Sequence, residues 1–240
     1  MNYLTIGILV IIIVICLYTV FYFLNPGYIF DKTKPLNEIY KVGLDKIEQT
    51  DSIRYYYEMW LLVDGNFPAD KINVIFGRGN SFIVGLKGSD LSFYYAKGSN
   101  KGIYDASRGV FTTGTDTKTM SIAKNFPFQK WTHFLLNVDS GTVDAYLDGK
   151  LVTSIQPDAA NTNSSTYIPY ADASNDTINI GNVHTHGKIT RFRRLASNVN
   201  PQEVWNHYML GNGLGTSLTP YHIDLKILKD NKEQNNTRIF

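Results

Sequence analysis

The stretch KWTHFLLNVDSGTVDAYLDGKL (130–151) decides the class of fold. In its second half apolar residues alternate with polar ones, as in a β-strand with one buried face. Two turn pairs, Ser140-Gly141 and Asp148-Gly149, reverse the chain on either side of this strand, and Asp-Gly suits a type I′ hairpin turn. The stretch therefore predicts three consecutive antiparallel strands.

Similar short runs, most of them closed by glycine, continue along the chain. They predict strands at 55–63, 72–79, 81–88, 91–98, 120–128, 131–138, 142–149, 150–155, 177–182, 187–195 and 221–228. Many short strands at regular spacing are typical of an antiparallel sandwich. We expect an all-β fold, a two-sheet antiparallel jelly-roll sandwich that occupies 46–240 and includes the C-terminal strand.

One helix interrupts the predicted strands. Asn200 is its expected N-cap, Pro201 takes the first helical position, and Glu203 completes a capping-box pattern. Gly211 ends the pattern, so the helix is expected over 201–210. Its apolar residues form one stripe, which predicts that it docks on a sheet.

Composition excludes several classes of protein. The net charge of the 240-residue chain is only +2, which gives no reason to expect a nucleic-acid partner. The chain has one cysteine, Cys16, so no disulfide can form within it and no cysteine-based zinc site is available.

Residues 4–24, LTIGILVIIIVICLYTVFYFL, form an uncharged apolar run. As a helix the run would extend about 31 Å, the thickness of a hydrocarbon core. A cleaved signal peptide and a buried core helix are the alternatives, but no Lys or Arg precedes the run and no small-residue cleavage site follows it. We expect a tail at 1–3, a single transmembrane helix at 4–24 and a tether at 25–45.

Basic residues set the expected orientation of this single-pass membrane protein. They follow the apolar run and none precedes it, so the positive-inside rule places the large domain on the cytoplasmic side. The lysines concerned are Lys32, Lys34, Lys41 and Lys46. In a lumenal domain, three sequons would instead be glycan acceptors. They begin at Asn163, Asn175 and Asn235.

WTHFLLNV (131–138) followed by GTVDAYLDGKLV (141–152) resembles the concanavalin A-like lectin/glucanase superfamily, in its laminin G-like branch. INIGN with GKITRFRRL, and the capped helix VNPQEVWNHY, are similar to further parts of that pattern. The resemblance implies a core position for Trp131, with His133 packed near it. The residues expected to be structural are Trp131, His133, Tyr146, Asp148, Gly149, Gly181, Gly187, Asn200 and Pro201.

A lectin-like sandwich on a membrane helix, with the short charged tail at 229–233, is also similar to virion proteins of large icosahedral double-stranded DNA viruses. That resemblance implies a minor capsid protein at the interface between an inner virion membrane and the capsid shell. The implied partners are the lipid bilayer and capsid proteins.

Catalytic carboxylates are not evident. Glucanases of the superfamily carry a Glu-x-Asp-x-(x)-Glu run along one strand, which sets two carboxylates about 5.5 Å apart. The five glutamates of this chain form no such run. Asp144 and Asp148 are the nearest pair on a strand, but Asp148 belongs to the turn. We expect no enzymatic activity.

Metal sites have weak candidates. His184 and His186 could place two imidazoles on one side of a strand, although an exposed loop is the simpler interpretation. Some relatives bind calcium through loop oxygens, but no ligand set can be carried over to this chain. We therefore expect no cofactor, with calcium as the remaining candidate.

Two groups of residues are candidates for an interface. A basic run on one predicted strand forms either a solvated face or a contact with an acidic protein. Adjacent tyrosines on two other strands should place some rings outward, where they suit protein or sugar binding. The residues are Lys188, Arg191, Arg193, Arg194, Tyr55, Tyr57, Tyr94 and Tyr95.

Three functions remain open. The first is a non-enzymatic structural protein that links a virion membrane to the capsid. The second is a membrane-displayed lectin, with its domain on the outer side and glycans as its ligands. The third, a divergent glycoside hydrolase, is favoured least because the carboxylate run is missing.

Overall fold

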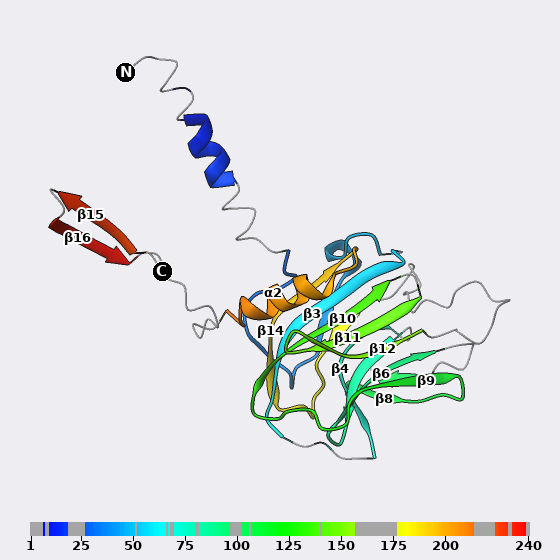
Figure 1. The fold of residues 1–240 in the computed structure, drawn as a ribbon. Coiled ribbons are helices and arrows are strands. Elements are labelled where there is room, and N and C mark those ends of the chain that lie inside the picture. The colour runs from blue at the N-terminus through cyan, green and yellow to red at the C-terminus, as the bar shows by residue number, and fades with distance from the viewer. Residues whose placement is uncertain are drawn as a thin grey trace.

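The chain folds into a β-sandwich in the computed structural model (Figure 1). The structure describes residue 7 and residues 10–18, 27–50, 52–65, 67, 70–79, 82–96, 102–105, 107–139, 141–156, 177–213, 224–229 and 232–238. The expected all-β sandwich of two antiparallel sheets with one short helix is confirmed.

One sheet has six strands, all antiparallel to their neighbours. In spatial order they are β1 (Lys34–Pro35), β14 (Gly187–Leu195), β3 (Arg54–Val63), β10 (Trp131–Asp139), β11 (Thr142–Leu147) and β12 (Lys150–Ile155). The three strands of the opening stretch are therefore neighbours at one edge, as the turn signals predicted. Asp148 and Gly149 both have positive φ, of 48° and 76°, which is the signature of a type I′ turn.

The second sheet has eight strands. Along its main path they are β2 (Tyr40–Val42), β13 (Ile178–Ile180), β4 (Ile72–Arg78), β5 (Phe82–Lys87), β6 (Asp90–Ala96) and β9 (Thr117–Ala123). A hairpin of β7 (Ile103–Asp105) and β8 (Val110–Thr112) joins it through β4. The sequence did not predict β1, β2, β7 or β8, because two or three residues show no period.

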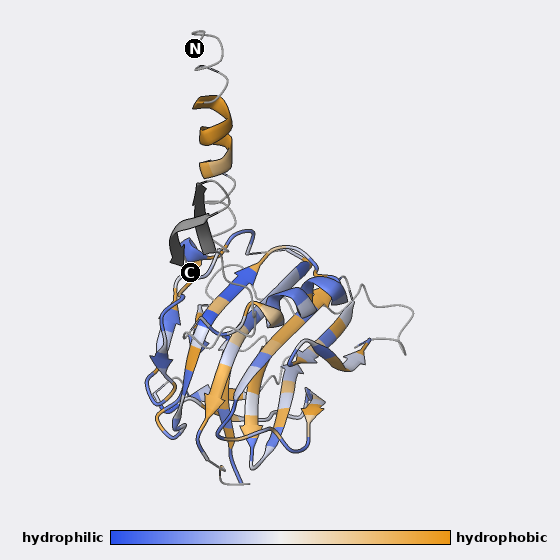
Figure 2. Ribbon diagram, turned by 60° about the vertical axis from the view of Figure 1, so that its left-hand side comes forward, coloured by the Kyte–Doolittle hydropathy of each residue, from blue (hydrophilic) through white to orange (hydrophobic). Residues whose placement is uncertain are grey.

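The main core lies between the two sheets, and aromatic rings fill its centre. The ring of Tyr57 on β3 lies 5.3 Å from Phe76, 5.4 Å from Phe82 and 6.2 Å from Phe192. Phe134 of β10 meets Phe76 at 6.0 Å. Hydrophobic and hydrophilic residues alternate along the strands that flank this core (Figure 2).

Helix α2 (Pro201–Met209) lies across the outer face of the six-stranded sheet (Figure 1). Asn200 caps it as predicted: its side chain accepts the N–H of Glu203, and the Glu203 carboxylate accepts the N–H of Asn200. Val204 of the helix packs with Tyr56, Leu135 and other residues in a second apolar cluster. The six-stranded sheet is consequently covered on both faces beneath α2.

The segment assigned to a tether, 25–45, belongs in large part to the sandwich, which corrects that expectation. From Tyr28 onward the described chain runs along β14, pairs with it as β1, and crosses to the other sheet as β2. Leu36 is fully buried in the core, and a 3-10 turn, η1 (Leu44–Lys46), follows. Burial of apolar side chains such as Leu36 stabilises the contact of this segment with the sandwich. That stabilisation outweighs the preference of its Pro and Gly residues for an extended, unpacked course.

The C-terminal strand also differs from expectation. Instead of completing the sandwich, β15 (Asp224–Lys229) pairs with β16 (Lys232–Arg238) in a separate two-stranded sheet. The reason is local, since β15 and β16 are close in sequence and pair antiparallel from Lys229 opposite Lys232.

Residues 10–18 are helical and hydrophobic (Figure 2). Among the residues that the structure describes, no helix is both long and apolar enough to cross a membrane. Apart from Gly7, the rest of the expected span 4–24 lies outside the described residues.

Phe192 should be a more important core residue than Trp131. Phe192 is fully buried, so Phe192→Ala should lower the free energy of unfolding by about 3–5 kcal/mol through lost burial and a cavity. Trp131 is only half-buried, so Trp131→Ala should cost clearly less. Urea unfolding of the full chain in detergent, followed by circular dichroism, compares the two. An equal or larger loss for Trp131→Ala would contradict this order.

Candidate functional site

A surface pocket of about 440 Å³ opens between the Asp148-Gly149 turn, the start of β10 and helix α2. It is lined by Pro127, Lys130, Thr132, Leu147, Asp148, Lys150, Val152, Trp205 and Tyr208. Residues 130–151 supply five of these nine. The stretch that decides the fold therefore also builds most of the pocket.

Asp148 holds the turn at one side of this pocket in place. Its backbone N–H donates to the carbonyl of His133 at 2.9 Å, and its Oδ1 accepts the N–H of His133 at 3.0 Å. Its Oδ2 accepts a hydrogen bond from Lys130 Nζ at 2.7 Å. Both carboxylate oxygens are thus engaged within the protein, and the turn is held rigidly against the start of β10.

Trp205 and Tyr208 form the aromatic wall. They lie three residues apart and so share one face of α2, with ring centroids separated by 5.4 Å. Gly149 lies beneath them with φ +76°, and a Cβ at that position would come within 2.9 Å of Trp205 Cε3. Glycine therefore lets the helix approach the turn closely. Trp205 remains 39% exposed, so part of its ring is available at the mouth of the pocket.

Charge in the pocket is slightly positive. Two lysines face one carboxylate, and that carboxylate is already paired with Lys130. Lys150 is exposed, and no ion pair within the described residues involves it. The side chain of Lys150 can therefore donate to a ligand without first breaking a contact.

A buried charged cluster lies under α2, next to the aromatic wall. The carboxylate of Glu58 on β3 accepts two hydrogen bonds from Arg193, from Nε at 2.9 Å and Nη2 at 2.6 Å. His133 Nε2 lies 3.1 Å from the other carboxylate oxygen. His207 Nδ1 lies 3.1 Å from Glu58 Oε2 and 2.9 Å from Arg193 Nη2, so it can donate to the carboxylate or accept from the guanidinium, but not both.

This cluster fixes the charge of Glu58. Burial alone would raise the pKa of the carboxyl, because the charged form loses its hydration. Hydrogen bonds from His133 and His207, together with the positive charge of Arg193, outweigh burial and hold the pKa of Glu58 well below its usual range. Glu58 is therefore an ionised carboxylate that the fold pairs, as a buried charge requires.

The aromatic rings above link this cluster to the surface pocket. Trp60 lies 5.2 Å from the ring of His133 and stacks on Tyr208 at 5.7 Å. Tyr208 in turn contacts Trp205. Movement of α2 would consequently disturb both the pocket and the ion pair.

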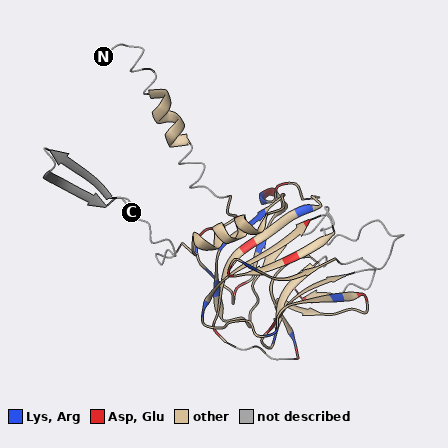
Figure 3. Cartoon of the chain, in the orientation of Figure 1, with Lys and Arg blue, Asp and Glu red and all other residues tan. Residues whose placement is uncertain are grey.

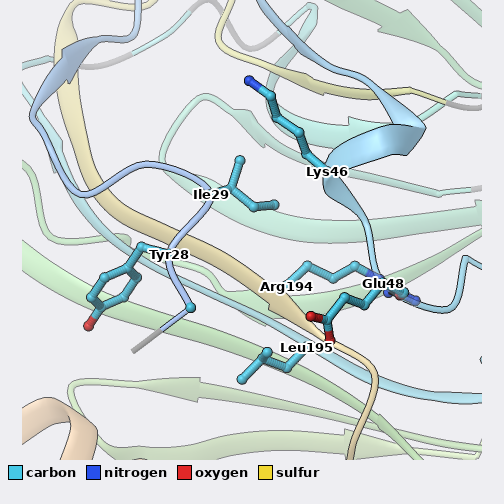
Figure 4. Close-up of a pocket in the computed structure, with 7 residues that line it drawn as sticks. Tyr28, Ile29, Lys46, Glu48, Arg194 and Leu195 are labelled. Carbon is cyan, nitrogen blue, oxygen red and sulfur yellow. Dashed lines mark hydrogen bonds between the residues drawn. The ribbon is translucent and has the colours of Figure 1, made fainter. Parts of the chain in front are cut away.

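A second pocket, of about 330 Å³, lies where the N-terminal segment meets the end of β14 (Figure 4). It is lined by Gly27, Tyr28, Ile29, Lys46, Glu48, Arg194 and Leu195. Tyr28 and Lys46 point away from each other, and the guanidinium of Arg194 donates to the carbonyls of Glu48 and Gln49. Because its polar groups do not converge, this pocket is a weaker ligand site than the one beside α2.

The four tyrosines expected to contribute to an interface are buried. Tyr55 and Tyr57 face the core, while Tyr94 and Tyr95 are each at most 7% exposed. Tyr94 belongs to a third apolar cluster that includes Phe111 of β8. The interface expectation is wrong for these four residues, because Tyr55, Tyr57 and Tyr95 belong to the core between the sheets and the outer side of Tyr94 is covered by β8.

The basic run on β14 is not a continuous surface either. Arg193 pairs with Glu58, and Arg194 is 3% exposed. Arg191 bonds to the carbonyls of Leu210 and Gly211 at the end of α2, which leaves Lys188 exposed. Figure 3 shows Lys and Arg scattered over the sandwich without one basic stripe.

A β-bulge in β14 explains why the alternation of residues along this strand does not predict which of its arginines are exposed. The register of β14 against β3 shifts between Thr190 and Arg193, and Arg191 has φ +51°. With one extra residue in β14, Ile189 and Phe192 face the core three positions apart. Arg193 is thereby turned to the face that carries Glu58.

Trp131 and His133 differ in burial, and only Trp131 departs from the environment expected of it. Trp131 is the first residue of β10 and is half-buried, whereas core positions such as Phe134 and Leu136 have the opposite parity. The expected core position of Trp131 is therefore wrong. His133 is fully buried, and the rings of Trp60 and Tyr208 lie 5.2 Å and 6.1 Å from its ring.

The remaining candidates lie apart from both pockets. Tyr146 is buried beneath α2, Gly187 begins β14, and a Cβ on Gly181 would come within 2.2 Å of the Glu38 carbonyl oxygen. His184 and His186 are exposed. Within the described parts of the chain, no three His, Cys, Asp or Glu side chains gather closely enough to hold a metal ion. That the protein needs no cofactor, with calcium as the remaining candidate ion, stays a prediction.

Glu58, Trp205 and Tyr208 are the residues that pattern reasoning missed. A lone glutamate within the apolar run YYYEMWLLV was a signal for Glu58, since a charge among buried positions needs a partner. Trp205 looked like part of the docking stripe of α2. Its exposure depends on Gly149, which is 56 residues away in the sequence, so no local pattern reports it.

Comparisons with known proteins agree with the fold. Residues 48–205 match the family model described as the concanavalin A-like lectin/glucanases superfamily. A candidate carbohydrate binding protein from Bacteroides ovatus matches with TM-score 0.50 and 14% identity, over 76% of this chain and 48% of that chain. The botulinum neurotoxin serotype C1 binding domain matches with TM-score 0.47 and 13% identity, over 71% and 39%.

The chain thus spans less than half the length of either of these structures. A search of curated protein sequences found no match. At such identities the structural likeness shows the fold.

Glu58→Gln should destabilise the sandwich, because it leaves the buried Arg193 without a countercharge. We expect a loss of about 3–5 kcal/mol at neutral pH. A lowered carboxyl pKa stabilises the fold above the unfolded value of about 4.3, and that stability is lost as pH falls below it. The difference in unfolding free energy between wild type and Glu58→Gln should therefore shrink between pH 5 and pH 3.

The matched control is Asp144→Asn, which changes a half-buried carboxylate that only accepts from Ser154 Oγ. Urea unfolding at each pH measures both variants. A pH-independent difference for Glu58→Gln would contradict the ionised state of Glu58.

Proposed function

The chain belongs to the concanavalin A-like lectin/glucanase superfamily, and we propose that its sandwich is a non-enzymatic module that binds carbohydrate in the pocket beside α2. The observation that carries the proposal is the exposed ring of Trp205 over a rigid turn with polar side chains around it. Binding pockets commonly combine an apolar wall with a few placed polar groups. The Bacteroides ovatus protein that shares the fold is named for the same class of ligand.

The polar groups of the pocket favour a hydroxyl-rich ligand with some negative charge. Lys150 can donate to sugar oxygens, and the apolar face of a sugar ring can lie on Trp205. Asp148 is neutralised by Lys130, so the charge of Lys150 is the one left for the ligand. We therefore expect acidic sugars to bind more tightly than neutral ones.

The carboxylates of the site support a binding role rather than hydrolysis. Glycoside hydrolases place two carboxyl groups about 5–10 Å apart across the scissile bond. The pocket lining contains one, Asp148, and both of its oxygens are held by hydrogen bonds within the protein. Glu58 is buried beneath α2 and paired with Arg193.

We further propose that residues 4–24 anchor this module in a bilayer. The supporting observation is the helix at 10–18, whose large apolar side chains from Val10 to Tyr18 are 48–69% exposed. Side chains of this kind gain stability in lipid. Glycan binding requires the domain on the side opposite to the cytoplasm. The lysines that follow the run favour the other side, but that bias acts on short loops and large domains translocate largely regardless of it.

A second candidate function is the link between an inner virion membrane and the capsid shell. The lysine bias is the specific observation that favours it, because this link needs the domain on the cytoplasmic side. Orientation therefore separates the two functions.

Trp205→Ala should weaken binding of the full chain, in detergent, to immobilised glycans that bear carboxylate or sulfate groups. Loss of a stacked aromatic wall costs about 1–3 kcal/mol, a drop in affinity of about fivefold to 150-fold. His184→Ala is the matched control, since it alters an exposed side chain outside the pocket. Equal binding by wild type and Trp205→Ala would overturn the assignment of this pocket.

Orientation is tested by expressing the full chain in eukaryotic cells and digesting it with an N-glycosidase. The displayed-lectin function predicts glycans at Asn163 and Asn175, both of which lie outside the described residues. Asn163→Gln with Asn175→Gln should remove the mobility shift. A membrane-bound chain without any shift would favour the capsid link.

A further inference from the structure

We propose that the folded sandwich is held against the lipid bilayer, with the end of β14 and its neighbouring loop facing the headgroups. This inference rests on the membrane anchor of the proposed function and goes beyond it, because it assigns a lipid-facing surface to the folded domain. That surface, the lipid-facing end, consists of Lys46, Glu48, Ile53, Arg54 and Leu195.

The chain becomes fixed to the sandwich very soon after the apolar run. Ile29 N donates to the carbonyl of Phe192 at 2.9 Å, and Phe30 exchanges two backbone hydrogen bonds with Phe192. The rings of Phe30 and Phe192 stack at 5.4 Å. Thr190 Oγ1 donates to the Asp31 carbonyl at 2.7 Å. These contacts hold residues 29–31 against β14 by the same kind of backbone hydrogen bonds that join neighbouring strands.

The length of chain between anchor and sandwich is therefore short. The apolar run ends at residue 24, and five residues lead from there to Ile29. Fully extended, five residues reach at most about 18 Å. The headgroup layer of one leaflet takes up about 5–8 Å of that distance, which is half the difference between a whole bilayer and its core. The sandwich consequently cannot stand away from the membrane, in contrast to the long tether expected from the sequence.

The register of the sheet identifies which end lies at the bilayer. The N-terminal segment runs along β14 from Leu195, beside Gly27, towards Gly187, beside Leu36. Leu195 is paired with Tyr56 near the start of β3, which begins at Arg54. The chain therefore enters at the end of the sheet that carries the lipid-facing end.

The side chains of the lipid-facing end are compatible with a bilayer surface but should not bind it strongly by themselves. Ile53 is 49% exposed and can enter the headgroup layer, and Lys46 and Arg54 can reach phosphates. Glu48 and the ion pair between Arg54 and Asp139 balance their charge. The short covalent link to the anchor therefore keeps the domain close to the bilayer, because it raises the effective concentration of the lipid-facing end at the membrane. Since attraction between charges contributes little, high salt should not move the domain away.

The same geometry directs the sugar pocket away from the membrane. Tyr56, opposite Leu195, pairs with Asn137 of β10, while the pocket lies at the Trp131 end of that strand. Six residues along a strand cover about 20 Å. The pocket beside α2 would therefore open outward, where a large glycan can reach it.

The experiment uses the full chain in vesicles of phosphatidylcholine, with Cys16→Ser removing the one native cysteine. A fluorophore is attached through Lys46→Cys at the lipid-facing end, or through Lys87→Cys at the β5–β6 turn, the opposite end of the other sheet. Lipids with a nitroxide on the headgroup then quench the label. We expect several-fold stronger quenching at position 46 than at 87, unchanged by high salt.

Each outcome separates the two proposals. Flotation of the chain with the vesicles but equal quenching at both positions would overturn the lipid-facing assignment alone. A chain that fails to float would overturn the anchor, and this inference with it. Inserting a Gly/Ser linker of about 20 residues between Pro26 and Gly27 should reduce quenching at position 46 to that at 87. Undiminished quenching would show that the short link is not the cause.

Discussion

The ion pair between Glu58 and Arg193 is the constraint on which the outer layer of this protein depends. It joins β3 to β14, and through His133 and His207 it reaches β10 and α2. A buried carboxylate is tolerated only when paired, so these four elements must keep their relative positions for the fold to be stable. The bulge in β14 is the structural means to this end, because it turns Arg193 towards Glu58 while Phe192 stays in the core.

The proposed sugar pocket is a consequence of that arrangement. α2 is held from below by Glu58 through His207, at its start by the Asn200 cap, and at its end by Arg191. With the helix fixed, the close approach of Gly149 leaves Trp205 half over the turn and half in solvent. Its wall is therefore preorganised, which reduces the entropy lost when a ligand binds.

The N-terminal segment determines at which end of the six-stranded sheet the apolar run joins the sandwich. Its hydrogen bonds to β14 leave few residues between the apolar run and the sheet, so under the proposed anchor the direction of the strand would set the orientation of the domain relative to the bilayer. A display protein gains from this arrangement, because a rigid domain presents its pocket at a defined height. A protein that bridges to a distant shell would need a longer link or a partner that comes to the membrane.

The sequence by itself determined the strands from 55–63 to 187–195, the type I′ turn at Asp148-Gly149 and the capped helix. Each of these follows from backbone periodicity or from a few adjacent residues. The tertiary structure decided what covers each strand face. Period-two alternation distinguishes two faces, but not which is solvated, so the interface expected from tyrosines and arginines such as Tyr94 and Arg193 does not form, because packing buries them. The bulge, the partner of Glu58 and the exposure of Trp205 all depend on contacts between residues more than fifty positions apart, which a local pattern does not encode.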